Sequence, residues 1–260
     1  MSASEAVAAL GERLRPLGWV SDLWVAGSLA GGDHVPGVSD LDLVAMVVDE
    51  ITPERRRAIE EIHRELDLGV AAGEDLGCQY VVHELLPVRA TAHPTWTHGS
   101  MVDRTLSGIT RAELVRFGYA VLGRAPSDVV PPMGDDEVRD AARAELRGYR
   151  AWASRRPTMW LSPVIADLGL TAMARGRHAL ETGQLLTKSA AIEQAAAPVW
   201  LVDQLRARRR GEAVVSPRWR TGWIAWRDAR RTVAAARPHG IRRREIRRSA
   251  AARRATRSGP

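Results

Sequence analysis

The amino-acid sequence predicts an α+β protein, with a small mixed sheet flanked by helices in residues 1–105 and an all-helical part in residues 106–236. Short apolar runs typical of strands alternate with helical periodicity in the first part, whereas helical periodicity prevails in the second. Residues 237–260 hold nine Arg and one Glu, which predicts a basic, disordered tail. The chain therefore divides into two folded parts and a tail.

The first part is predicted to begin with a helix over residues 3–16, where apolar residues recur at helical spacing. Another helix is expected at residues 53–68, because Thr52 is a suitable N-cap and is followed by Pro53. Strands are expected at residues 19–26, 41–48 and 78–86. The segment 91–108 shows no clear period and is expected to be irregular.

The second part is predicted to be helical throughout. Thr110 and Glu113 have the spacing of a capping box, which predicts a helix from residue 110 to about residue 122. Further helices are expected at residues 134–155, 160–182, 187–196, 198–210 and 218–236. The last of these carries Trp219, Trp223 and Trp226 at helical spacing, which favours a core-facing stripe.

The composition excludes several classes of protein. No apolar run is long enough for a transmembrane helix, and the N-terminus lacks the pattern of a signal peptide, so no membrane partner and a cytoplasmic location are expected. The single cysteine, Cys78, excludes an intrachain disulfide. The tail carries a formal charge of +8 against +7 for the whole chain, so nucleic acid is expected to bind only through the tail. The sequence does not indicate an oligomeric state.

Two short motifs lie where the first strand of the sheet ends and where the second begins. Gly27-Ser28 comes directly after the first strand, and Ser39-Asp40-Leu41-Asp42 opens the second. Asp40 and Asp42 point to the same side because they are two residues apart in extended chain. Two carboxylates beside an apolar strand are costly without a positive charge between them, and Mg²⁺ supplies that charge together with substrate phosphates. The glycine turn and the serine hydroxyl can hold those phosphates.

These motifs resemble the signature of the polymerase-beta nucleotidyltransferase superfamily. Within it, the chain is similar to the aminoglycoside adenylyltransferases of the streptomycin and spectinomycin type, which carry a C-terminal helical domain. The segments that carry this second resemblance are Gly118–Pro126, Leu170–Arg175, Ala179–Gln184 and Leu186–Ala191. Together the matching segments cover roughly residues 20–210.

The resemblance implies transfer of AMP from magnesium-bound ATP to a hydroxyl of a small acceptor, for example an aminoglycoside, with release of pyrophosphate. It implies that Asp40 and Asp42 are catalytic and bind Mg²⁺. The nucleotide-binding residues that it implies are Gly27, Ser28, Ser39, Arg175 and Lys188. In the helical part, Arg175 and Lys188 match basic positions that contact the ATP phosphates, so the nucleotide is expected between the two parts.

The resemblance also implies a third carboxylate, on a later strand, that takes the proton from the attacking hydroxyl. At that position this sequence has Gln79, which cannot act as a base. Glu84 and Asp75 are the nearest carboxylates, and Glu84 is taken as the candidate catalytic residue, with Asp75 and His83 as alternatives.

Two other functions stay open from the sequence. Because the third carboxylate is missing, the chain fits a catalytically weakened nucleotide-binding or antitoxin-like regulatory protein. The arginine-rich tail fits an enzyme whose acceptor is a protein or an RNA. An acceptor pocket for a cationic small molecule is expected to include acidic and aromatic residues, for which Trp152, Trp160, Asp167 and the segment 93–99 are candidates.

Deletion of residues 237–260 distinguishes a small acceptor from a polymeric one. We expect the truncated protein to keep transfer to a small acceptor, because neither motif lies in the tail. Binding to RNA, if it occurs, should weaken sharply and lose its dependence on salt concentration, since the phosphate contacts would be gone. Filter binding at two salt concentrations, beside a transfer assay, measures both; loss of small-molecule transfer on truncation would contradict the expectation.

Overall fold

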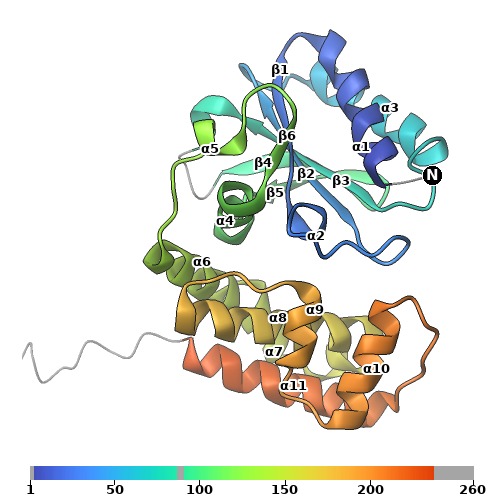
Figure 1. Cartoon of the computed structure of the whole chain (residues 1–260), viewed down its shortest axis with the longest axis vertical. Coiled ribbons are helices and arrows are strands. Elements are labelled where there is room, and N and C mark those ends of the chain that lie inside the picture. Colours follow the sequence, from blue (N-terminus) through green and yellow to red (C-terminus); the bar gives the residue numbers. More distant parts are fainter. Residues whose placement is uncertain (1–2, 87–90, 237–260) are drawn as a thin grey trace, which may run out of the picture.

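The computed structural model describes residues 3–86 and 91–236. A sheet with its covering helices forms one half of the molecule, and a bundle of helices forms the other (Figure 1). The strands are β1 (Val20–Val25), β2 (Leu41–Val47), β3 (Leu76–Val82), β4 (Ala92–Thr97), β5 (Ser100–Thr105) and β6 (Tyr119–Leu122). The predicted α+β class, a mixed sheet followed by a helical region, is therefore confirmed.

The helices of the first half lie on both faces of the sheet. They are α1 (Ala3–Leu14), η1 (Arg15–Leu17), α2 (Gly27–Ala30), α3 (Pro53–Leu68), η2 (His83–Leu85), α4 (Gly108–Phe117) and α5 (Pro126–Val129). The second half contains α6 (Asp135–Arg147), α7 (Tyr149–Ser154), η3 (Pro157–Leu161), α8 (Pro163–Thr182), α9 (Lys188–Glu193), α10 (Val199–Arg209) and α11 (Arg218–Ala235).

The strands lie in the order β5-β4-β3-β2-β1-β6. Strands β2 and β3 are parallel, with Asp42 level with Gly77, and the other neighbouring pairs are antiparallel. The parallel pair is joined through α3, whose N-cap Thr52 accepts a hydrogen bond from the Arg55 amide as predicted. Both motifs of the sequence consequently lie next to each other at one end of the strands, where β1 ends and β2 begins.

The two faces of the sheet are covered by different helices. On one face α1 and α3 bury Leu10, Leu14 and Ile59 against alternate strand residues such as Leu43 and Tyr80. On the other face Leu114 of α4 packs with Trp24, Val44 and Met46. Asp42 shares the face of Val44 and Met46, because residues two apart on a strand point to the same side. The carboxylate of Asp42 therefore points toward the side that α4 covers.

Two predictions about secondary structure were wrong. The segment 91–108 is not irregular but forms the hairpin of β4 and β5. The helix expected from residue 110 to residue 122 begins earlier, with Ser107 as N-cap, and ends at Phe117, after which β6 joins β1 at the sheet edge. Helical spacing in a ten-residue segment did not reveal where the helix stops and an edge strand begins.

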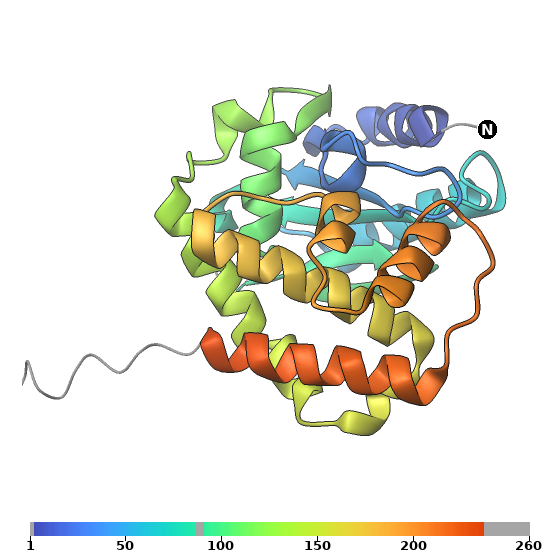
Figure 2. The same ribbon diagram turned by 60° about the horizontal axis from the view of Figure 1, so that its bottom comes forward.

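In the helical half, α8 lies centrally and packs on α6, α9 and α11. The Trp160 ring fills the space between α8 and α11, and a Cβ at Gly169 would lie 2.2 Å from it. Figure 2 shows α11 as the long helix on the outer side of this half. The prediction of a core-facing tryptophan stripe was wrong, because Trp219 and Trp223 are exposed and Ala225 and Ala229 of α11 face the core instead.

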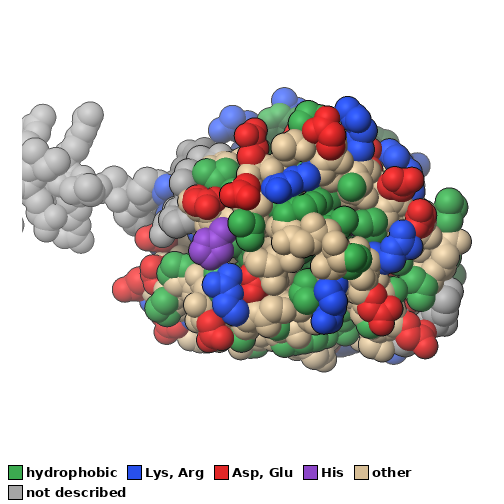
Figure 3. Space-filling model, turned by 90° about the horizontal axis from the view of Figure 1, so that it is seen from above, with side chains coloured by type: hydrophobic (Ala, Val, Ile, Leu, Met, Phe, Trp, Pro, Cys, Tyr) green, Lys and Arg blue, Asp and Glu red, His purple; other side chains and the backbone are tan. Residues whose placement is uncertain are grey.

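The described surface mixes charges of both signs. Seen from the end that carries the sheet, acidic and basic side chains alternate over the molecule (Figure 3). Among residues 3–86 and 91–236, no helix combines the length and apolar character needed to cross a bilayer.

Asp22 of β1 links this strand to the segment that follows the edge strand β6. Its buried carboxylate accepts hydrogen bonds from the backbone amide of Arg124 (2.7 Å), from the Arg124 guanidinium (2.8 Å) and from Ser21 Oγ (2.7 Å). Burial acts to raise the pKa of Asp22, but these hydrogen bonds and the Arg124 charge outweigh it and lower the pKa. Because Arg124 follows β6, the ion pair holds the last strand against β1.

Replacing Asp22 with alanine should destabilise the protein by about 2 kcal/mol, the usual loss when a hydrogen-bonded buried charge is removed. Urea unfolding followed by circular dichroism measures the change. Asp136→Ala is the matched control, since Asp136 is an exposed aspartate that pairs with Arg139 on the surface of α6. A loss no larger than in the control would show that the Asp22–Arg124 pair does not stabilise the fold.

Candidate functional site

The turn between β1 and α2 passes unusually close to Asp42. Gly27 has a φ of 59°, and a Cβ at this position would lie 2.1 Å from Asp42 Oδ2. Glycine adopts this conformation without strain, and any Cβ here would collide with the carboxylate. The next residue, Ser28, is buried, and its Oγ has no hydrogen-bond partner in the part of the chain that the structure describes. The turn thus presents a free hydroxyl beside Asp42.

Asp40 and Asp42 are held at the start of β2. The Ala26 amide donates to the Asp42 carbonyl (2.8 Å), which fixes the turn against the strand. Both aspartates line a cavity of about 220 Å³ between the two halves. The other polar or charged residues around this cavity are Ser28, Asp33, Glu113, Arg175, Thr187 and Lys188.

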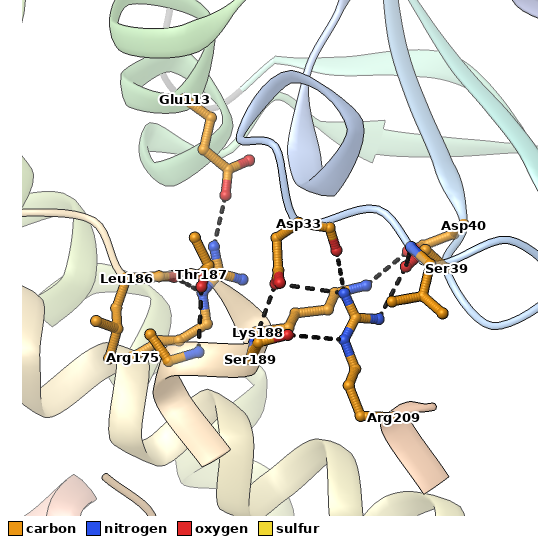
Figure 4. Close-up of polar contacts among 12 residues, drawn as sticks. Asp33, Ser39, Asp40, Glu113, Arg175, Leu186, Thr187, Lys188, Ser189 and Arg209 are labelled. Atoms are coloured by element: carbon orange, nitrogen blue, oxygen red, sulfur yellow. Dashed lines mark hydrogen bonds and ion pairs between the residues drawn. The ribbon is translucent and has the colours of Figure 1, made fainter. Parts of the chain in front are cut away.

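The helical half supplies two cations to this cavity (Figure 4). Lys188, the first residue of α9, places Nζ 2.6 Å from Asp40 Oδ1. Arg175 of α8 donates to the Leu186 carbonyl (2.8 Å) and pairs with Glu113 Oε1 (2.6 Å). The cavity therefore has carboxylates on its sheet side and positive charges on its helical side.

The pKa values of the two aspartates are shifted in opposite directions. Burial, followed by the negative charge of Asp40, raises the pKa of Asp42 to about 7. Burial also acts to raise the pKa of Asp40, but the hydrogen bond and charge of Lys188 outweigh it and lower the pKa. No hydrogen bond from the described residues reaches the Asp42 carboxylate. The surroundings of Asp42 thus disfavour its charged form, whereas those of Asp40 favour it.

This arrangement fits a magnesium ion held by two carboxylates. Among the described residues no cluster of three or more His, Cys, Asp or Glu side chains has the geometry of a metal site. Mg²⁺ commonly binds through one or two carboxylates and completes its octahedral shell with phosphate oxygens and water. The raised pKa of Asp42 beside Asp40 fits such an ion, because a bound cation would favour the charged form of both carboxylates.

Contacts across the two halves hold the loop between the motifs. Asp33 accepts from the Ser189 amide (2.9 Å) and pairs with Arg209 (3.3 Å), which also donates to Ser39 Oγ (2.8 Å). Burial acts to raise the pKa of Asp33, but Ser189 and Arg209 outweigh it and lower the pKa. Ser39, predicted to bind nucleotide, has its hydroxyl engaged by Arg209 and by the Val35 amide (3.0 Å). In this structure the Ser39 hydroxyl therefore stabilises the loop between the two motifs.

The structure does not bring the predicted base Glu84 to the aspartate pair. Glu84 lies in η2, beyond the end of β3 that is level with Val47, whereas Asp42 is level with Gly77. Five strand residues separate the two levels, or roughly 17 Å at ~3.3 Å per residue. His83 lies in the same short helix. Asp75 precedes β3 and pairs with His98 (2.7 Å), and the Gln79 amide donates to the Arg104 carbonyl (2.6 Å).

Sequence reasoning missed two charged residues of this region, Glu113 and Arg209. Glu113 was interpreted as the last residue of a capping box opened by Thr110, whereas the structure has Ser107 as the N-cap and leaves the Glu113 side chain facing the cavity. Arg209 is one of several arginines at the end of α10, and nothing in the local sequence distinguishes it. Its role depends on a loop 170 residues away in the chain.

A second, larger cavity of about 810 Å³ adjoins the first. It lies between α4 and the helices α6 and α7, and its acidic residues are Glu113, Glu137, Asp140 and Glu145. Tyr149, Arg111, Arg150 and Arg175 also line it. The acceptor candidates from the sequence lie elsewhere: Trp160 is buried in the helical core, and Asp167 pairs with Arg208. Trp152 is exposed beside Tyr149, and His93 is buried in β4.

Comparison with known proteins supports the fold. The chain is similar to a spectinomycin adenyltransferase, AAD(9), from Enterococcus faecialis, solved with ATP and spectinomycin, with a TM-score of 0.66. The match covers 89% of this chain and 99% of that one at 14% sequence identity. At that identity the likeness establishes the fold alone. No protein-family model and no curated protein matches the sequence.

Replacing Asp42 with asparagine should stabilise the metal-free protein at pH 8. Because the pKa of Asp42 is raised from 3.8 to about 7, the folded state alone holds this proton between those values, and stability falls as the pH rises through that window. The gain in the variant should be roughly 4 kcal/mol at pH 8 and should vanish near pH 4. Urea unfolding in the presence of a chelator measures it.

The control for this prediction is Asp203→Asn, an exposed aspartate paired with Arg206 on α10. It should show no such pH-dependent gain. Equal stability of the Asp42→Asn variant and the unsubstituted protein at pH 8 would mean that the Asp42 charge is already balanced within the chain.

Proposed function

We propose that the protein is a nucleotidyltransferase that moves AMP from magnesium-bound ATP to a hydroxyl of a small acceptor. The observation that carries the proposal is the convergence of Gly27, Ser28, Asp40 and Asp42 with Lys188 and Arg175 on one cavity. A free serine hydroxyl, two carboxylates and two cations are the groups needed to hold a triphosphate and its metal. The similarity to an adenyltransferase fold supports the same assignment.

Each group has a role in this proposal. Asp40 and Asp42 hold Mg²⁺, and Ser28 Oγ donates a hydrogen bond to a phosphate oxygen. Mg²⁺, when bound, neutralises charge that develops on the phosphate oxygens and the leaving pyrophosphate. Arg175 and Lys188 bind the phosphates from the helical side. Since the cations come from α8 and α9 and the carboxylates from β2, the nucleotide lies between the two halves.

The larger cavity is the proposed acceptor site. Its volume of about 810 Å³ lies within the usual range for small-molecule pockets. Four carboxylates line it against three arginines, so it suits a polyhydroxylated molecule that carries amino groups. The solved adenyltransferase of similar fold was crystallised with spectinomycin, which has this chemistry. An aminocyclitol or aminoglycoside is therefore the acceptor class we propose.

An assay with labelled ATP, Mg²⁺ and a panel that includes spectinomycin and streptomycin tests the function. We expect pyrophosphate release that requires an acceptor, stops on addition of a chelator and falls about 100-fold or more in Asp42→Asn, because the metal site is lost. Asp203→Asn serves as the control, since Asp203 lies on the surface of α10. Tight binding of Mg-ATP without turnover on any acceptor would contradict the proposal and favour a nucleotide-binding regulatory protein.

A further inference from the structure

We propose that Glu113 is the general base of this active site. It takes the place of the carboxylate expected on β3, where this chain has Gln79. The inference rests on the proposed nucleotidyl transfer. It concerns which group removes the proton from the acceptor hydroxyl, and it assigns that task to a residue on α4 rather than on β3.

The position of Glu113 between the two cavities is the main argument. Of the described residues, only Glu113 and Arg175 line both the cavity that holds the aspartate pair and the larger cavity proposed for the acceptor. A base must touch the acceptor hydroxyl while that hydroxyl faces the nucleotide phosphate. A carboxylate at the junction of the two cavities meets this requirement, and Arg175 does not, because a guanidinium keeps its proton.

The packing of α4 fixes Glu113 at this junction. Ser107 caps the helix by accepting from the Thr110 amide (2.9 Å), and the neighbours of Glu113, Ala112 and Leu114, are buried. The Glu113 side chain is 13% exposed and forms an ion pair with Arg175. Arg175 occupies Oε1, and no hydrogen bond from the described residues reaches Oε2. One carboxylate oxygen is thus free to accept a proton while the other is held in place.

The other carboxylates near β3 are less suited to this task. Glu84 lies beyond the far end of the strand, and Asp75 is engaged by His98. Neither lines either of the two cavities. The side-chain amide of Gln79 donates to the Arg104 carbonyl and has no basic oxygen with which to take a proton.

In the proposed step, Glu113 Oε2 takes the proton of the acceptor hydroxyl as the hydroxyl oxygen attacks the α-phosphorus of ATP. A new bond forms between that oxygen and the α-phosphorus. The bond between the α-phosphorus and the oxygen that bridges to the β-phosphorus breaks, and pyrophosphate leaves with the electron pair. The products are the adenylylated acceptor, pyrophosphate and a protonated Glu113, which then releases its proton to solvent.

Glu113→Gln tests the assignment because glutamine keeps the size of the side chain and a hydrogen bond to Arg175 but cannot accept the proton. We expect kcat with spectinomycin, or with whichever acceptor of the panel turns over, to fall between about 100-fold and 10,000-fold. The affinity for Mg-ATP should stay within about threefold, and Glu113→Asp should recover part of the loss.

The pH profile separates a base from a structural residue. The acidic limb of the kcat profile should disappear in Glu113→Gln, whereas loss of a merely structural contact would lower the rate at every pH. The charged groups that line the two cavities with Glu113, and so influence this limb, are Arg111 of α4, Asp40 and Asp42 at the start of β2, Asp33, Arg175 of α8, Lys188 of α9, Glu137, Asp140 and Glu145 of α6, and Arg150 of α7. The control is Glu181→Gln, an exposed glutamate of α8 outside both cavities, which should leave kcat and its profile unchanged.

Three results overturn the assignment. Turnover of Glu113→Gln within threefold of the unsubstituted enzyme would remove Glu113 from the chemistry while leaving the transferase function intact. A loss of Mg-ATP affinity with an unchanged pH profile would make it a structural residue. A large loss in Glu84→Gln or Asp75→Asn instead would move the base to that residue. Absence of turnover in the unsubstituted enzyme on every acceptor, with Mg-ATP bound, would instead refute the function itself.

Discussion

The like charges of Asp40 and Asp42 at the start of β2 are the constraint on which the rest of the site depends. Two carboxylates side by side, both only partly exposed to solvent, raise the free energy of the fold unless cations lie near them. Lys188 answers the charge of Asp40, and Asp42 keeps a raised pKa because its burial and the negative charge of Asp40 outweigh the charges of Lys188 and Arg175. The cation that pairs with Asp40 comes from the helical half, so the packing of the two halves supplies this charge.

The junction between the halves follows from the same constraint. Lys188 and Arg175 come from helices that are distant in sequence from the aspartates, and Arg209 secures the loop that carries Ser39. A substitution that moves any of these helices would therefore change the charges around Asp40 and Asp42 at the start of β2. The positions of α8, α9 and α10 therefore depend on polar contacts at the site as well as on apolar packing in the helical core.

Local signals in the sequence were enough to predict the aspartate pair, the glycine turn and most helices, because each depends on neighbours within a few residues. The N-cap Thr52 and the buried strand at residues 41–47 are of this kind. The hairpin of β4 and β5 and the edge strand β6 were not predictable from spacing, because their strands are partly exposed and depend on pairing with distant strands. Glu113 was not predicted as a site residue because its spacing from Thr110 also fits a capping box.

The shared position of Arg175 has a thermodynamic consequence. Its guanidinium borders both cavities and is bonded to Glu113 and to the Leu186 carbonyl. In the proposed function, a phosphate that attracts Arg175 would weaken its ion pair with Glu113, so binding in the smaller cavity would change the electrostatic field in the larger one. By linkage, a cationic ligand in the larger cavity would then change the affinity of the smaller one by the same factor. Arg175 is thus the residue through which the two proposed sites would be coupled.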